Sequence, residues 1–306
     1  MVELKLKLPD SFFLGEERDG YLVTPEMKKV WAVELDLLAE FMRVCQNYNI
    51  QWWADAGTIL GAARHKGFIP WDDDIDVMMM RDEYNRFIEL CSGDFKQPYY
   101  LQHGDETCHF HLQLRNSLTT GILKNGSLNK YQFNQGIFID IFPIDDKVDD
   151  PLLFAQQCRE IKALKKKALI YKTAIMGRPL FHLRKNVYLY LKTIAYSIYL
   201  KISHTTPNIK VIIHEIDKVA SKYDNGDTKE VCKMVLKVKP RRFWKRDWFS
   251  DTVYLPFEMF KLPVPIGYEK LLDRFYNNWH EYVIGTATHG SVFFDTDKPY
   301  TEYIRR

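Results

Sequence analysis

The segment from Trp52 to Met79, WWADAGTILGAARHKGFIPWDDDIDVMM, sets the strongest limit on what this chain can fold into. Four carboxylates occur within five residues of it, between strongly apolar flanks, at Asp72, Asp73, Asp74 and Asp76. Like charges buried side by side are destabilised by desolvation and by mutual repulsion. The segment therefore predicts a compensated polar site at the edge of a packed core.

The apolar run from Ile75 to Met80 favours a β-strand, in which residues two apart point to the same face. On such a strand Asp74 and Asp76 present their carboxylates side by side. Asp72 joins them if the strand starts early and is otherwise a loop or capping residue. Asp73 is expected to be a loop or capping residue.

A further carboxylate, Asp140, lies between large apolar residues in the sequence Phe138-Ile139-Asp140-Ile141-Phe142. An aspartate in that setting is costly to bury without a partner. If the two strands pair, Asp140 joins Asp74 and Asp76 in one cluster. Hard oxygen ligands suit Mg²⁺ or Mn²⁺, and convergent carboxylates with Mg²⁺ recur in reactions at phosphorus.

A glycine turn precedes these acids. Gly57-Thr58 falls between an expected strand, 50–54, and an expected helix, 58–65, where free backbone N–H groups favour an anion such as phosphate. Arg64, His65 and Lys66 follow, and they either reach that phosphate or form a solvated helix end.

Composition excludes several classes. With 306 residues, 46% hydrophobic, the chain can bury a large core, and a net charge of +3 gives no argument for nucleic acid binding. Five cysteines without a C-x-x-C pair fit a reducing cytoplasmic setting better than a disulfide framework. Neither a secretory signal nor a membrane-spanning run is expected.

Four residues resemble zinc ligands, namely His103, Cys108, His109 and His111. His109 and His111 share a strand face while Cys108 points away from it, and no second cysteine pair exists. We expect these to be ordinary strand residues.

The spacing of apolar residues predicts a helix over 25–48, another over 81–91, and strands at 99–102, 109–115 and 137–142. We divide the chain into a core at 1–150, a basic helical insert at 151–223, and a mixed region at 224–306 that completes the core. The lysine-rich insert is favoured as a solvated face, with contact to an anionic membrane as the alternative. Its segment 184–202 reads either as an interfacial helix or as a buried one.

Two of these motifs resemble the LicD family of nucleotidyltransferase-fold proteins. The first runs from Asp55 to Ala62 and on through RHKG and IPWDDDID, and the second is GIFIDIFPID at 136–145. Here Thr58 stands where that fold's turn more often carries serine. The resemblance implies an α/β (α+β) fold, with a small mixed sheet flanked by helices and a helical insert.

The resemblance also implies a reaction. Family members transfer a phosphorylated alcohol, notably phosphocholine from CDP-choline, to cell-surface glycans such as lipopolysaccharide, teichoic acid or capsule, and relatives such as fukutin-related protein transfer ribitol phosphate. Asp74, Asp76 and Asp140 are then expected to be catalytic residues that hold the metal, with Asp140 as first choice for proton acceptor. Gly57 and Thr58 are expected to bind phosphate, Arg64 or His65 to steady the leaving group, CMP, and Lys66 to belong to the substrate-binding set.

Two other functions stay open. One is true nucleotidyl transfer from an NTP, on a small molecule before nucleic acid. The other is a non-catalytic regulator of glycan modification. The implied partners are a CDP-alcohol donor and a glycan acceptor, lipid-linked if the insert contacts a membrane.

Overall fold

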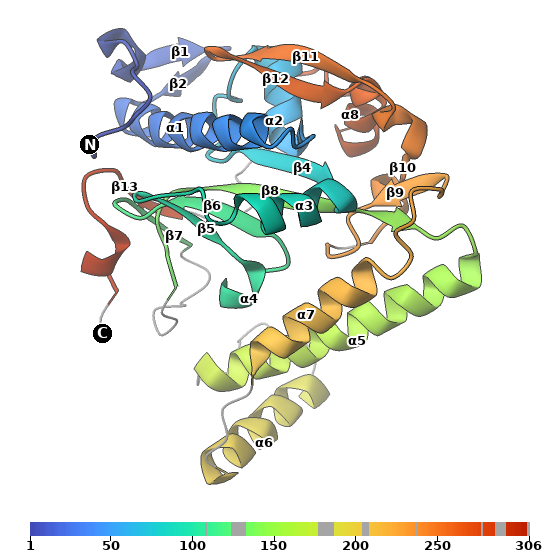
Figure 1. Ribbon diagram of the computed structural model, residues 1–306. Coiled ribbons are helices and arrows are strands. Elements are labelled where there is room, and N and C mark those ends of the chain that lie inside the picture. The colour runs from blue at the N-terminus through green and yellow to red at the C-terminus, as the bar shows by residue number, and fades with distance from the viewer. Residues whose placement is uncertain are drawn as a thin grey trace.

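A mixed sheet lies at the centre of the protein in a computed structural model (Figure 1), which describes residues 1–107, 109–123, 133–176, 187–203, 208–236, 238–276, 278–284 and 292–304. Its main path runs β10-β9-β8-β4-β3, and β6 pairs with β8 and β5 in turn. The strands are β3 (Trp53–Ala54), β4 (Asp76–Met80), β5 (Tyr99–Gln102), β6 (Leu112–Asn116), β8 (Phe138–Lys147), β9 (Glu230–Cys232) and β10 (Trp244–Lys245). The expected α/β class is confirmed.

Strand β8 organises the sheet. It has ten residues, of which all but the last are buried. It pairs in parallel with β4, antiparallel with β6 near its start, and antiparallel with β9 near its end. Burial on both faces explains why 138–144 is an almost continuous apolar run.

Helices cover both faces of the sheet (Figure 1), and α1 and α3 pack on its strands. Helix α1 starts where expected, because the Thr24 side chain accepts a hydrogen bond from the Met27 N–H. The main core contains Trp31, Phe41, Trp53 and Phe87. The helices are α1 (Pro25–Asn47), α2 (Ala56–Leu60), α3 (Arg81–Cys91), α4 (Gly104–Thr107), α5 (Pro151–Met176), α6 (Val187–Ser203), α7 (Ile209–Ala220) and α8 (Tyr268–Tyr276).

Three small antiparallel pairs complete the described part of the chain: β1 (Glu16–Arg18) with β2 (Tyr21–Val23), β7 (Thr120–Leu123) with β13 (Val292–Asp295), and β11 (Thr252–Phe257) with β12 (Phe260–Pro265). Single 3₁₀ turns occur at Asp10–Phe13, Pro240–Arg242, Arg246–Phe249 and Tyr300–Glu302. The β11–β12 hairpin lies over β3, on the side of the molecule that carries α1 (Figure 1).

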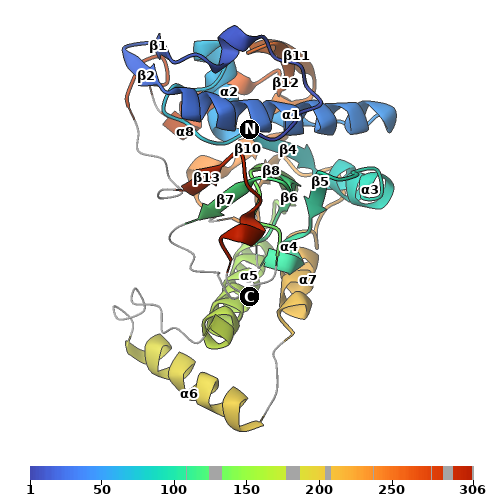
Figure 2. The ribbon, with the colours of Figure 1, turned by 90° about the vertical axis from the view of Figure 1, so that its left-hand side faces the viewer.

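The chain leaves the sheet at the end of β8, forms α5, α6 and α7, and re-enters the sheet as β9. Helices α5 and α7 pack on each other through a small separate core that includes Ile161, Ile212 and Ile216. Figure 2 shows α6 beyond α5, at the end of the molecule away from the β11–β12 hairpin. Within this stretch the described residues 151–176, 187–203 and 209–220 are helical.

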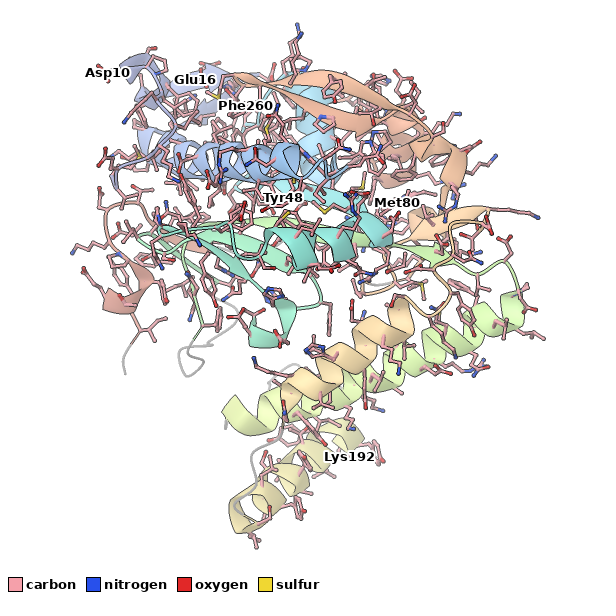
Figure 3. The ribbon with its side chains drawn as sticks, viewed as in Figure 1. Asp10, Glu16, Tyr48, Met80, Lys192 and Phe260 are labelled. Atoms are coloured by element: carbon pink, nitrogen blue, oxygen red, sulfur yellow. The ribbon has the colours of Figure 1, made fainter. Side chains whose placement is uncertain are left out.

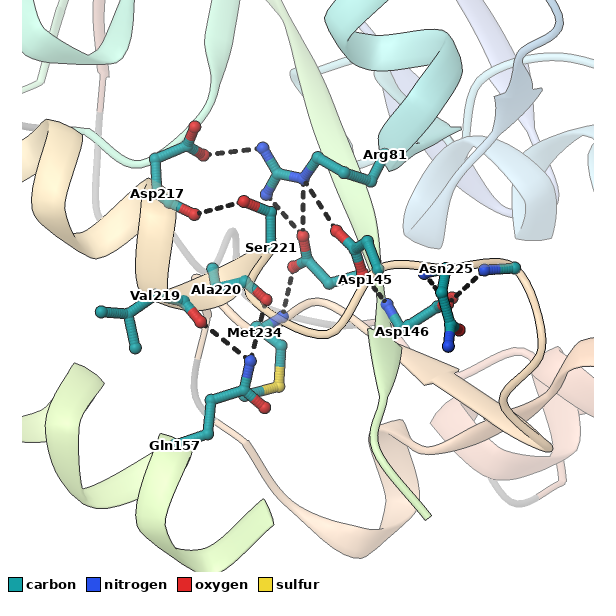
Figure 4. Close-up of polar contacts among 12 residues, drawn as sticks. Arg81, Asp145, Asp146, Gln157, Asp217, Val219, Ala220, Ser221, Asn225 and Met234 are labelled. Carbon is teal, nitrogen blue, oxygen red and sulfur yellow. Dashed lines mark hydrogen bonds and ion pairs between the residues drawn. The ribbon is translucent and has the colours of Figure 1, made fainter. Parts of the chain in front are cut away.

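A buried ion-pair network fixes this helical segment to the sheet (Figure 4). Arg81, at the start of α3, donates to Asp145 of β8 through Nε at 2.7 Å and to Asp217 of α7 at 2.7 Å. The other Asp145 oxygen accepts from the Met234 N–H at 2.9 Å. Arg81 and Asp145 are almost fully buried, so neither charge is compensated by water.

Asp224 borders this network and carries a testable pH dependence. Burial and then the neighbouring Asp145 raise its pKa from 3.8 to about 7. The folded state therefore holds a proton that the unfolded state releases near pH 4, and stability falls as pH rises from about 4 through 7. Asp224→Asn should flatten that fall and, above pH 7, raise the free energy of unfolding by on the order of 1–2 kcal/mol. Urea unfolding of both proteins across this pH range measures it; parallel pH profiles would contradict the assignment.

The predicted elements differ from the structure mainly at their ends. The strand expected at 50–54 is reduced to Trp53–Ala54, and the one expected from Ile137 continues to Lys147. Cys108 and residues 184–186 lie outside the described residues. Cys45, Cys91, Cys158 and Cys232 are free thiols. Within the described ranges, every helix is too short or too polar to cross a membrane.

Candidate functional site

The strand pairing expected from the sequence is confirmed at the acids. Asp76, the first residue of β4, lies opposite Asp140 of β8 in the parallel register, and Asp140 in turn lies opposite Gln113 of β6. Neighbours in register share a face of the sheet. Two carboxylates from segments 64 residues apart in the sequence are thus brought side by side.

Asp74 is placed differently from the prediction. Strand β4 begins at Asp76, so Asp72, Asp73 and Asp74 belong to the preceding loop and the alternation of a strand does not apply to them. Carboxylate oxygens of these three residues lie within 4.8 Å of one another. The site therefore has two parts, a loop with three acids and a strand pair with two.

The loop is held by residues around it. The Trp31 indole N–H donates to the Asp72 carbonyl oxygen at 3.0 Å, and the Asp72 N–H donates to the Ile69 carbonyl oxygen at 2.9 Å. A Cβ added to Gly57 would lie 2.6 Å from Asp72 Oδ2. A side chain at position 57 would displace the Asp72 carboxylate from the turn.

The two strand carboxylates differ in their hydrogen bonding. Asp140 Oδ1 accepts from the Gln113 amide at 2.7 Å and lies 3.0 Å from His111 Nε2. Burial raises the pKa of Asp140, but His111 and Gln113 outweigh it and lower that pKa to about 2. Among the described residues no such donor contacts the Asp76 carboxylate, and burial followed by the charges of Asp74 and Asp140 raises its pKa well above the usual range.

A second set of contacts fixes Gln113. Arg115 donates to Gln113 Oε1 at 2.5 Å and to the Gly136 carbonyl oxygen at 2.7 Å. The Gln113 side-chain N–H in turn donates to Asp140. Arg115 is fully buried, and desolvation lowers its pKa to about 10. This chain of donors orients the Asp140 carboxylate without adding a charge in contact with it.

The glycine turn lies directly against β4. The Asp55 N–H donates to the Asp76 carbonyl oxygen at 2.9 Å, and the Asp76 N–H donates to Thr58 Oγ1 at 2.9 Å. Ala56, between them, has a φ of 41°, a left-handed conformation rarely adopted by alanine and often found at functional turns. The hydroxyl hydrogen of Thr58 is not used by the Asp76 contact and can still be donated to an anion.

Thr58 therefore has a structural task that a conservative pair of substitutions tests. Thr58→Val removes the acceptor from the Asp76 N–H and should lower the free energy of unfolding by about 1–3 kcal/mol. Thr58→Ser keeps the oxygen and should stay close to the wild type. Urea unfolding of the two variants measures this; a loss in Thr58→Ser with none in Thr58→Val would show that the methyl group, not the hydrogen bond, matters.

Arg64 and His65 belong to a π-helix, Gly61–His65, that continues α2. Arg64 donates to the carbonyl oxygens of Trp279 and Glu281, and its Nε donates to His65 Nε2 at 2.9 Å. His65 Nδ1 therefore carries the proton and donates to Asp19 at 2.6 Å. Both side chains tie segments of the protein together.

Lys66 ends this helix in the left-handed conformation and is exposed. Binding of a phosphate or a leaving group by Arg64, His65 or Lys66 stays a prediction, as does phosphate binding by Gly57 and Thr58. The metal-ligand roles of Asp74, Asp76 and Asp140 stay predictions too.

Sequence reasoning missed two buried charges beside the site. Glu34 of α1 is 1% exposed, and burial followed by the charges of Asp74 and Asp73 raises its pKa well above the usual range. Its sequence signal was an acid on the apolar face of a helix, three residues after Trp31.

Lys233, just after β9, forms a buried ion pair with Asp55, and its ammonium group lies 4.2 Å from the Phe142 ring centroid. Lys233 had no local signal, because only the return of the chain to β8 brings it here.

Comparisons with known proteins match this same region. Residues 49–157 match the family model described as LicD/FKTN/FKRP, nucleotidyltransferase domain. A lipopolysaccharide cholinephosphotransferase LicD of Haemophilus influenzae is 44% identical over 72 residues, which is 24% of this chain and 27% of that protein.

An uncharacterised protein of Rickettsia typhi is 43% identical over 56 residues, 18% of each chain, and one of Rickettsia prowazekii is 51% identical over 35 residues, 11% of this chain and 13% of that protein. The matched parts thus span about a quarter or less of the curated relatives. Every candidate residue from Gly57 to Asp140 lies inside the region that matches the family model.

Proposed function

We propose that this chain, whose residues 49–157 match the LicD family model, transfers a phosphorylated alcohol, phosphocholine first of all, from a CDP-linked donor to a hydroxyl group of a cell-surface glycan. The observation that carries this proposal is the register of Asp76 and Asp140, two carboxylates side by side beneath a glycine turn. The named relative from Haemophilus influenzae, a lipopolysaccharide cholinephosphotransferase, supports phosphocholine as the group and lipopolysaccharide as the acceptor.

The donor set of the site fits a divalent cation. The ligand atoms that the loop and the strand pair offer are carboxylate oxygens. Mg²⁺ and Mn²⁺ prefer such hard oxygen ligands. Burial and the neighbouring carboxylates raise the pKa values of Asp76 and Glu34, so a bound cation would favour their ionised forms. Asp74, Asp76 and Asp140 would hold the ion, with Asp72 and Asp73 next to them. When bound, it would neutralise charge on the phosphate oxygens of the donor.

The residues of the chain perform the remaining tasks. Backbone N–H groups and the Thr58 hydroxyl at the turn bind a donor phosphate. The acceptor oxygen attacks the phosphorus that bears the alcohol, the bond from that phosphorus to the bridging oxygen breaks, and CMP leaves with the electron pair. The acceptor proton passes to a carboxylate of the cluster. Asp140 is the first candidate, because His111 adjoins it and can take the proton onward.

We also propose a cytoplasmic setting for this reaction, since the four described cysteines are free thiols, three of them buried. The domain description keeps a second candidate open, transfer of a nucleotide from an NTP. In that reaction the nucleotide phosphorus is attacked and pyrophosphate leaves.

Thermal unfolding with added ligand separates these candidates. The wild type would be heated with CDP-choline, CDP-ribitol, CDP-glycerol or ATP, each with and without Mg²⁺. A ligand that binds only the folded state at a hundredfold excess over Kd adds about 2.7 kcal/mol of stability. Asp76→Asn tests the site, and Asp227→Asn, an exposed aspartate in the loop before β9, is the matched control.

A Mg²⁺-dependent shift with one CDP-alcohol, lost in Asp76→Asn and kept in Asp227→Asn, would support the proposal and identify the donor. A shift with ATP alone, with pyrophosphate release on turnover, would replace it by nucleotidyl transfer. The absence of any shift would favour a regulator without catalysis.

A further inference from the structure

Helix α6 exposes an apolar face that no other described part of the chain covers. Of its side chains that the structure describes, only that of Thr193 is buried. Four large apolar residues, Val187, Leu191, Ile198 and Ile202, are 52–75% exposed. Their spacing of four, seven and four residues places them on one face of the helix. An exposed apolar stripe of this kind marks an interaction surface.

The surrounding charge is strongly one-sided. Residues 151–203 contain eleven lysines and arginines and one acid, Glu160, whereas the whole chain has a net charge of +3. The remainder of the chain therefore carries −7. Helix α6 itself has no acidic residue in its sequence. Figure 3 shows Lys192 of this helix far from Glu16 and Phe260, on the side of the sheet away from them.

A groove of about 640 Å³ between α5 and α6 lies beside the apolar stripe. Lysines and tyrosines line it, among them Lys166, Lys167, Lys192, Tyr188, Tyr196 and Tyr199. Tyr171 of α5 stacks on Tyr196 of α6 with ring centroids 4.9 Å apart. The groove residues of α6 follow the stripe by one position, at 188, 192 and 199, so the two surfaces are adjacent around the helix.

Apolar residues flanked by lysine and tyrosine suit the boundary between lipid chains and head groups, where aliphatic side chains enter the lipid, tyrosine rings lie at head-group depth, and lysines meet phosphate. A symmetric dimer through this face fits less well, because each copy would bring its ten net positive charges to the contact. The charge thus favours a lipid surface over a symmetric dimer through this face.

We propose that α5 and α6 dock on the surface of a bilayer rich in anionic phospholipid, without crossing it. The contact consists of the apolar stripe of α6 in the acyl boundary and Lys166, Lys167 and Lys192 on the lipid phosphates. The inference rests on the proposed function only for its purpose, which is to bring the donor site to a glycan carried by a membrane.

Binding of the full chain to vesicles tests the proposal. Sedimentation would be measured with vesicles of phosphatidylcholine alone and of phosphatidylcholine with phosphatidylglycerol, at low and at high salt. Binding should require phosphatidylglycerol and should weaken with salt. Each lysine near an anionic surface strengthens binding, so replacing Lys166, Lys167 and Lys192 by glutamate should weaken binding by at least about a hundredfold.

The matched control makes the same change in net charge outside α5 and α6. It places glutamate at three exposed lysines, Lys245, Lys261 and Lys270. This control should bind nearly as the wild type does. Leu191→Gln with Ile198→Gln tests the apolar stripe, at positions already exposed and therefore tolerant of the change.

Equal binding to both vesicle types or no binding to either would overturn the proposal. Equal losses of vesicle binding in the two variants with three glutamates would also overturn it. So would a concentration-dependent dimer abolished by Leu191→Gln with Ile198→Gln. Thermal shift with the CDP-alcohol donor is read in parallel on each variant. A docking-deficient variant that keeps its donor shift separates failure of docking from failure of the proposed reaction.

Discussion

Asp76→Asn should lower the rate of transfer by at least about a hundredfold, because an ion that neutralises phosphate charge contributes several kcal/mol to the transition state and loses an anionic ligand here. The same substitution should leave the metal-free protein as stable as the wild type or more so. Burial and then the charges of Asp74 and Asp140 raise the pKa of Asp76 in the folded state, so its ionisation opposes folding as pH rises above the unfolded value. Asparagine is neutral at every pH and removes that opposition.

CMP release from the CDP-alcohol donor measures the activity, and urea unfolding at neutral pH with a chelator measures the stability. Asp227→Asn, exposed in the loop before β9, is the control for loss of one carboxylate. Near-normal turnover in Asp76→Asn would remove the strand pair from the reaction. A large loss of stability would instead give Asp76 a structural task that the hydrogen bonds do not show.

The second large effect is on folding. Arg81→Met should lower the free energy of unfolding by about 3–5 kcal/mol, because it leaves the buried carboxylate of Asp145 without its ion partner. Asp217 loses the same partner, but its side chain is 51% exposed and becomes hydrated. It therefore adds little to the loss in the free energy of unfolding. The measurement is urea unfolding at neutral pH, followed by both tryptophan fluorescence and far-UV circular dichroism.

A double substitution separates the unpaired charge from the lost packing. Arg81→Met with Asp145→Asn removes both charges, and the asparagine oxygen still accepts from the Met234 N–H. It should recover a substantial part of the loss seen in Arg81→Met alone. If the double variant is as unstable as the sum of the two single ones, the pair contributes no coupling and packing of the arginine stem explains the loss.

The sequence predicted the parts of the site that depend on local pattern. The apolar residues around Asp140 and after Asp76 predicted both strands, and the conditional expectation that they pair is confirmed. The start of α1 agrees with Thr24 and Pro25, and its length with the spacing of its apolar residues. The family resemblance drawn from the two motifs is confirmed by the match over 49–157.

Other features depend on contacts between distant segments and had no local signal. Asp74 was placed on β4 because its parity with Asp76 is right, yet the chain turns from loop to strand between the two, where the Asp76 N–H binds the Thr58 hydroxyl oxygen. The engagement of Arg64 with Trp279 and Glu281 needs residues more than 200 positions away. The approach of Lys233 to Asp55 likewise depends on the pairing of β8 with β9.

The pairing of β8 with β9 also allows the segment between these two strands to vary. Lys147 and Glu230 are opposite each other in an antiparallel ladder, so β8 and β9 form a hairpin whose connecting loop is the entire stretch 148–229. A loop that starts and ends at one rung can be lengthened, shortened or exchanged without altering the connectivity of the sheet, and its entropic cost rises only slowly with length. The family match ends at residue 157, just inside α5. Recombination or design can therefore graft other modules at this hairpin and keep the carboxylate strand intact, provided Arg81 and Asp145 are changed together with the Asp217 that the module supplies.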